Sequence, residues 1–246
     1  MMIDELAIYR GNNFYLNQKI VLRQPTVGEI CDYGEEHFWK TFHTLTATTA
    51  DLKVFIYDNL HKWWDEISNF EVFTGMYKSF TRNDTSIILG DLDLSKFEVA
   101  LDNKDNTVVL YNSDTDTVID EIIYEVIMEY IRKLCGFTKN TEVGTNKTTK
   151  RVMIDVDRDD MYFNQKNAKP FQSILLPMIS SMINSAGFKY NHQEVWDMPI
   201  FAFMDSVKRI QTITQYNNNM RGVYSGCLDS KKLNKKDLNW MHSFDS

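Results

Sequence analysis

Proline and glycine are scarce in this chain, whose 246 residues include only 4 Pro and 10 Gly. This scarcity excludes a collagen-like or linker-rich protein and argues against a turn-dense β-sandwich. Hydrophobic residues make up 43% of the chain and aromatic residues 13%, so a large core can be buried and disorder of the whole chain is excluded. We expect a mainly α, multi-helical fold with a short β-hairpin or small sheet.

Cysteines are few, and they stand far apart in the sequence. Cys31, Cys135 and Cys227 are odd in number and have no CxxC spacing, so neither a disulfide framework nor a zinc site is predicted. No apolar run approaches the length that crosses a bilayer, and the acidic start of the chain does not resemble a signal peptide. We expect a cytoplasmic protein without a membrane partner.

Catalytic and phosphate-binding motifs are missing as well. The densest carboxylate cluster is Asp155, Asp157, Asp159 and Asp160. A calcium loop starting at Asp155 would need Gly at its sixth position and Glu at its twelfth, where the chain has Asp160 and Lys166. We interpret the cluster as a solvated acidic turn. We expect no catalytic residue, no cofactor, no metal and no enzymatic activity.

The clearest local signal is the start of a helix at Thr26. Thr26 and Glu29 match a capping box, in which each side chain bonds the other residue's backbone N–H, so both residues are interpreted as structural. Apolar spacing of three and four residues then predicts one helix from Thr26 to about Leu45. A hairpin is predicted from the segments 92–101 and 107–111, joined by residues 102–106.

The longest regular apolar pattern runs from Ile119 to Leu134, and Gly136 supplies a terminating residue. Residues 138–150 have no such pattern, so we predict a flexible loop or junction there, between an N-terminal helical subdomain with the small β element, 1–137, and a C-terminal helical subdomain, 151–246. Further predictions are a short strand at 151–156, a helix at 170–186 kinked by Pro177, a helix that ends near 217–219, and a last short helix at 235–241.

Methionine gives the second half of the chain an adaptable apolar surface of the kind that accepts loosely specified helical partners. The candidate partner-binding residues are Met178, Met182, Met204, Met220 and Trp196. Ordinary core filling is the alternative for these side chains.

Residues 208–246 carry seven Lys or Arg against three Asp, although the whole chain has a formal charge of −7. This basic tail is either an arm for an acidic partner or a solvated terminal surface.

Two segments resemble a known group of proteins. Residues 22–39, which contain Pro-Thr-Val-Gly-Glu-Ile at 25–30, resemble the opening of tail assembly chaperone-like proteins of tailed phages of low-GC Gram-positive bacteria. Residues 222–233 and 237–240 are similar to the end of the same group. The resemblance implies a non-enzymatic protein of viral tail assembly that binds helical segments of the tape-measure protein in the host cytoplasm and is displaced as the tail tube forms.

Two alternatives to the chaperone stay open. One is a structural component of the tail or baseplate that is retained in the virion. The other is a small metal-dependent enzyme acting on nucleic acid, which would need a carboxylate site built on Asp155 and Asp157. We expect the partner to be the tape-measure protein or another tail protein, with self-association as a further option, and we do not expect nucleic acid to be bound.

Overall fold

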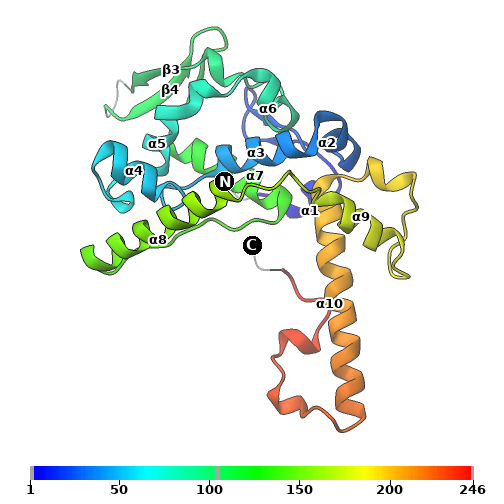
Figure 1. The fold of residues 1–246 in the computed structure, drawn as a ribbon. Coiled ribbons are helices and arrows are strands. Elements are labelled where there is room, and N and C mark those ends of the chain that lie inside the picture. Colours follow the sequence, from blue (N-terminus) through cyan, green and yellow to red (C-terminus); the bar gives the residue numbers. More distant parts are fainter. Residues whose placement is uncertain (1–2, 103–105, 245–246) are drawn as a thin grey trace.

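Helices dominate the computed structural model of the protein, which describes residues 3–102 and 106–244. The helices are α1 (Glu5–Tyr9), α2 (Val27–Tyr33), α3 (Glu35–Thr46), α4 (Lys53–Leu60), α5 (Asn69–Met76), α6 (Arg82–Leu89), α7 (Glu121–Cys135), α8 (Lys147–Lys166), α9 (Leu175–Ile183) and α10 (Ile200–Tyr224). The strands are β1 (Phe14–Tyr15), β2 (Val21–Leu22), β3 (Glu98–Leu101), β4 (Val108–Asn112) and β5 (Thr117–Ile119). The predicted mainly α-helical fold with a small β element is confirmed (Figure 1).

Local capping accounts for where α2 begins. The Glu29 N–H donates to Thr26 Oγ1 at 3.1 Å, and the Thr26 N–H donates to Glu29 Oε2 at 2.9 Å. These are the reciprocal hydrogen bonds that the sequence predicts, and the chain builds similar pairs before α5 and α6. The single helix predicted to reach Leu45 is wrong, because Gly34 has a φ of 99° and separates α2 from α3.

Several predictions in the second half of the chain are also wrong. Residues 151–156 are not a strand, and the carboxylates at 155–160 do not form a turn, because both segments lie within α8. Helix α8 begins at Lys147, where the Asn146 side chain accepts from the Thr149 N–H, so the irregular segment is shorter than 138–150. Helix α10 continues past 217–219 to Tyr224, and the last helix is only a short 3-10 turn at Lys236–Leu238.

The helix predicted at 170–186 is present in shortened form as α9. Pro177 lies in the first turn of α9, where a missing N–H removes no hydrogen bond within the helix.

The predicted hairpin is confirmed for the described residues. Strand β3 pairs antiparallel with β4, and β5 adds a third strand beyond β4. Part of the predicted connection at 102–106, residues 103–105, lies outside the described residues.

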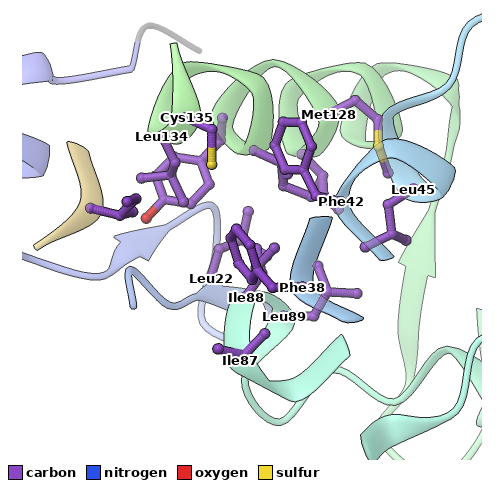
Figure 2. Packing of buried hydrophobic residues seen from close by; sticks show 14 of the residues in the cluster. Leu22, Phe38, Phe42, Leu45, Ile87, Ile88, Leu89, Met128, Leu134 and Cys135 are labelled. Atoms are coloured by element: carbon purple, nitrogen blue, oxygen red, sulfur yellow. The ribbon is translucent and has the colours of Figure 1, made fainter. Parts of the chain in front are cut away.

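The main core forms where α3, α6 and α7 meet. Phe38 and Phe42 of α3 are 1% exposed and belong to the same cluster of buried residues as Met128 and Leu134 of α7 (Figure 2). The same cluster of buried residues includes Leu175 of α9 and Phe203 of α10. Buried side chains from both sides of residues 138–150 thus share one apolar cluster, while the division of the chain into two subdomains stays a prediction.

A second, smaller core attaches α8 to the body. Trp64 is 1% exposed, and Ile154 of α8 is fully buried in the same cluster as Ile56 of α4. Lys53 Nζ lies 2.9 Å from Glu142 Oε2 and 2.7 Å from Asp157 Oδ2. Burial acts to lower the pKa of Lys53, but the hydrogen bonds with these two carboxylates outweigh it and the pKa is raised. The charged Lys53 side chain therefore connects α4 to α8 through its ion pair with Asp157.

Helix α10 leaves the body and projects away from it (Figure 1). The chain then turns back, and Arg209 Nη1 donates to the carbonyl oxygens of Trp240 at 2.6 Å and His242 at 2.9 Å. We call residues 211–241 the C-terminal arm. In the described part of the chain, no helix combines the length and apolar character that a membrane crossing requires.

Candidate functional site

A groove lies along the outer side of α7. Asp120 caps this helix by accepting from the Ile123 N–H at 2.7 Å, and Gly136 ends it with a φ of 70°. The inner side is fixed in the main core by buried residues such as Tyr130 and Ile131, both 0% exposed. The rigid placement of α7 thus leaves its outer residues facing solvent.

This groove, which we call the α7 groove, has a volume of about 820 Å³. Its lining residues are Glu121, Ile122, Glu125, Val126, Glu129, Arg132, Lys133, Phe137, Thr138 and Lys139. Ile122 is 75% exposed and Phe137 42%, which is unusual for large apolar side chains that share one depression. The groove therefore offers apolar surface that the chain itself does not cover.

The segment after Gly136 forms the second wall. The Phe137 ring lies 5.0 Å from the Phe42 ring and 5.4 Å from the His43 ring, so this wall rests on α3. Lys139 Nζ lies 2.7 Å from Glu125 Oε2 and ties the wall back to α7. Because α3 and this ion pair hold it from two sides, the second wall is preformed.

Glu125 has a second partner that fixes its orientation. Asn69 Nδ2 donates to Glu125 Oε1 at 3.1 Å. Burial acts to raise the pKa of Glu125, but the hydrogen bonds from Lys139 and Asn69 outweigh it, and the pKa lies below its ordinary value. Glu125 is therefore ionised at neutral pH, and its two carboxylate oxygens already bind Asn69 and Lys139.

Arg132 supports the base of the groove. Its guanidinium is buried, and Nη2 donates to the Thr46 carbonyl oxygen at 2.7 Å. Glu121 and Glu129 differ from Glu125, because the described residues provide neither of them with an ion pair within 4.0 Å. The groove thus combines exposed apolar side chains with two carboxylates that are available to a partner.

The α7 groove has the chemistry of a helix-binding site. An amphipathic helix places its anchors at i, i+3, i+4 and i+7, and Ile122, Val126 and Phe137 would receive such anchors. Glu121 and Glu129 would face Lys or Arg on the flanks of the bound helix, as charged residues beside an apolar seam do in coiled coils.

The five candidate residues from the sequence do not gather in this groove. Met178 and Met182 lie on α9, and Met182 is 4% exposed, so a partner could reach it only if α9 moved. Trp196 is half-buried and packs close to Gly28. Met220 lies in the C-terminal arm. A role in partner binding stays a prediction for all five residues.

Met204 is the candidate residue that lies nearest to the groove. It lines a smaller cavity of about 230 Å³ together with Phe201 and Asp205. This cavity shares Lys133, Phe137 and Thr138 with the α7 groove. The groove itself was not predicted from the sequence, although the apolar pattern from 119 to 134 is wider than a single buried stripe and Ile122 lies at its edge.

Two of the acidic residues of α8, Asp155 and Asp157, are used in ion pairs with neighbours. Arg158 Nη1 lies 2.6 Å from Asp155 Oδ1, while Asp157 contacts Lys53. Among residues 3–102 and 106–244, no group of three or more His, Cys, Asp or Glu side chains is arranged to hold a metal ion.

Comparison with known proteins gives one match. Residues 166–245 match a family described as YomV second domain, which is of phage origin. The matched part runs from the end of α8 through α9 and α10 to the end of the C-terminal arm. No curated protein matches the chain, and no solved structure does.

Proposed function

We propose that this is a non-enzymatic phage protein of tail morphogenesis, which binds a helical segment of the tape-measure protein in the α7 groove before the tail is complete. The α7 groove supports this proposal, because it exposes Ile122 and Phe137 and includes two carboxylates, Glu121 and Glu129, for which the described residues provide no ion pair. The match of residues 166–245 to a phage family supports the phage context.

The physical reason for such a role lies in the partner. A tape-measure protein is long and helical, and its apolar stripes would associate with one another before the tail tube surrounds them. A groove that covers one stripe keeps the segment in solution, and its moderate size allows later displacement by tube subunits. Binding of the tape-measure segment and its later release thus depend on the same exposed apolar surface.

Replacing Ile122 by glutamate is expected to weaken binding of the tape-measure segment by about thirtyfold or more, because a charge would replace an apolar contact, and a central anchor contributes about 2 kcal/mol. The measurement is co-purification after co-expression with the tagged tape-measure protein, followed by titration of the purified pair. Leu6→Glu is the matched control, since Leu6 is 72% exposed and lies on α1, outside the groove.

Failure of the unaltered protein to co-purify at low salt would contradict the proposal. Equal binding by Ile122→Glu and the unaltered protein would show that the tape-measure segment binds outside the groove. The structural alternative is tested separately with purified virions: a chaperone is absent from the finished particle, whereas a tail or baseplate component remains in it.

A further inference from the structure

Helix α8 presents a second uncovered surface, on the side opposite to its buried residue Ile154. At about 100° per residue, Val152, Val156 and Phe163 fall within about 40° of one another around the helix. All three are more than half exposed, at 56%, 53% and 66%. We call these residues, with Asp155, Asp159 and Asp160 beside them, the α8 ridge.

The ridge is acidic as well as apolar. Residues 155–160 contain four Asp and one Arg, a formal charge of −3. Asp159 and Asp160 are exposed, and neither has an ion pair within the described residues. A partner for the ridge must therefore combine apolar side chains with positive charge.

The C-terminal arm of the same chain has that chemistry. Residues 211–241 contain five Lys or Arg and two Asp, a formal charge of +3. Its exposed large apolar side chains are Tyr224 at 86%, Met241 at 68%, Leu228 at 41%, Trp240 at 38% and Leu238 at 37%. Lys231, Lys232 and Lys235 are exposed beside them. Charge and apolar character thus match between the arm and the ridge.

One molecule cannot bring its own arm and ridge together in this structure. The arm extends away from the body, whereas α8 lies along the body (Figure 1). Arg209 holds the returning part of the arm against α10 through the Trp240 and His242 carbonyl oxygens, and its guanidinium lies 4.1 Å from the centre of the Phe244 ring. The projecting arm is thus positioned to reach another molecule.

We propose that the C-terminal arm of one molecule docks on the α8 ridge of a second copy, and that the two copies exchange arms reciprocally. From Val152 to Phe163 the ridge spans about 17 Å of α8, so with a width of about 10 Å it offers roughly 170 Å². A single contact falls far short of the roughly 800 Å² of a stable interface, and reciprocal exchange doubles the buried area because each copy then buries both its ridge and its arm. Reciprocal exchange gives a closed two-fold dimer, the commonest oligomer.

Charge reversal tests the pairing in the full-length protein by sedimentation equilibrium at low salt. A ridge variant, Asp159→Lys with Asp160→Lys, and an arm variant, Lys231→Glu with Lys232→Glu, are each expected to raise the dimer dissociation constant about tenfold or more. Mixing the two variants is expected to restore dimerisation, because each docked arm then meets a ridge of opposite charge. The matched control reverses exposed charges elsewhere, with Asp32→Lys and Lys62→Glu.

The helical circular dichroism of each variant shows that it is folded. A protein that stays monomeric at low salt, at the highest concentration reached, overturns the proposal. Dimers that survive both reversals, or variants that fail to recover on mixing, also overturn it. The α7 groove variant Ile122→Glu is expected to keep the dimer, so loss of tape-measure binding and loss of self-association are separate results.

Discussion

Replacing Trp64 by alanine is expected to lower the free energy of unfolding by about 3–5 kcal/mol, the cost of removing a large, fully packed aromatic side chain. Trp64 is 1% exposed and is the largest side chain of the small core that it forms with Ala50, Ile56 and Ile154. Its indole Nε1 donates to the Glu142 carbonyl oxygen at 2.8 Å. The substitution therefore removes packing against α8 and also a hydrogen bond to the segment before it.

Urea unfolding followed by circular dichroism measures this loss. Trp64→Phe keeps most of the apolar volume but loses the N–H donor, so its expected cost is smaller, about 1–3 kcal/mol. Trp240→Ala is the control, because Trp240 is 38% exposed in the C-terminal arm and should cost less than about 1 kcal/mol. If Trp64→Ala changed stability by less than Trp240→Ala, the small core would not hold α8.

Replacing Glu35 by alanine is expected to cost about 1–3 kcal/mol by releasing the start of α9. The N-cap residue of α9, Ile174, has no capping side chain, and Ser173 Oγ accepts only from the Leu176 N–H. Glu35, at the start of α3, takes that role: Oε1 accepts from the Ile174 and Leu175 N–H groups, both at 2.7 Å, and Oε2 accepts from Ser173 Oγ. A carboxylate at the N-terminus of a helix also interacts favourably with the helix dipole.

The Glu35 contribution is expected to depend on pH. Burial acts to raise its pKa, but the hydrogen bonds from Ser173, Leu175, Ile174 and Trp39 outweigh it, and the pKa lies below the ordinary value of 4.5. Since the folded state holds the lower pKa, the stabilisation is complete above pH 4.5 and is lost as the pH falls through the folded-state pKa.

Urea unfolding at a series of pH values tests this dependence. The stability difference between the unaltered protein and Glu35→Ala should shrink in acid. Glu36→Ala is the matched control, because Glu36 is exposed and contacts only Lys40 on its own helix, so it should cost no more than about 0.5 kcal/mol. A difference that stays constant down to strongly acid pH would show that Glu35 acts through something other than its charge.

Local signals were sufficient to predict several elements of the fold. The Thr26 and Glu29 pair acts within one helical turn, and the apolar pattern ending at Gly136 describes a helix whose inner side is buried along its length. The prediction for residues 151–156 was wrong for a physical reason. Their β-branched run favours a strand, but the Asn146 cap and the burial of Ile154 against α4 favour a helix more strongly.

The position of the candidate groove could not be predicted from the sequence. An apolar pattern shows that a helix has an inner side, but it does not show which residue at the edge of the stripe is left uncovered. Ile122 is 75% exposed near the start of α7, and Phe137 lines the groove because the chain packs against α3 after Gly136. Both facts depend on residues far apart in the sequence.

The sequence by itself determined the helical class of this protein, the start of α2 and the placement of α7, because capping and apolar periodicity act between residues at most a few positions apart. The tertiary structure alone decided that α8 is a helix, that Glu35 caps α9, and that the acidic α8 ridge and the basic C-terminal arm are both exposed. The burial of Ile154 against α4 and the contact of Glu35 with Leu175 join residues about a hundred or more positions apart, and only the folded chain brings such residues together.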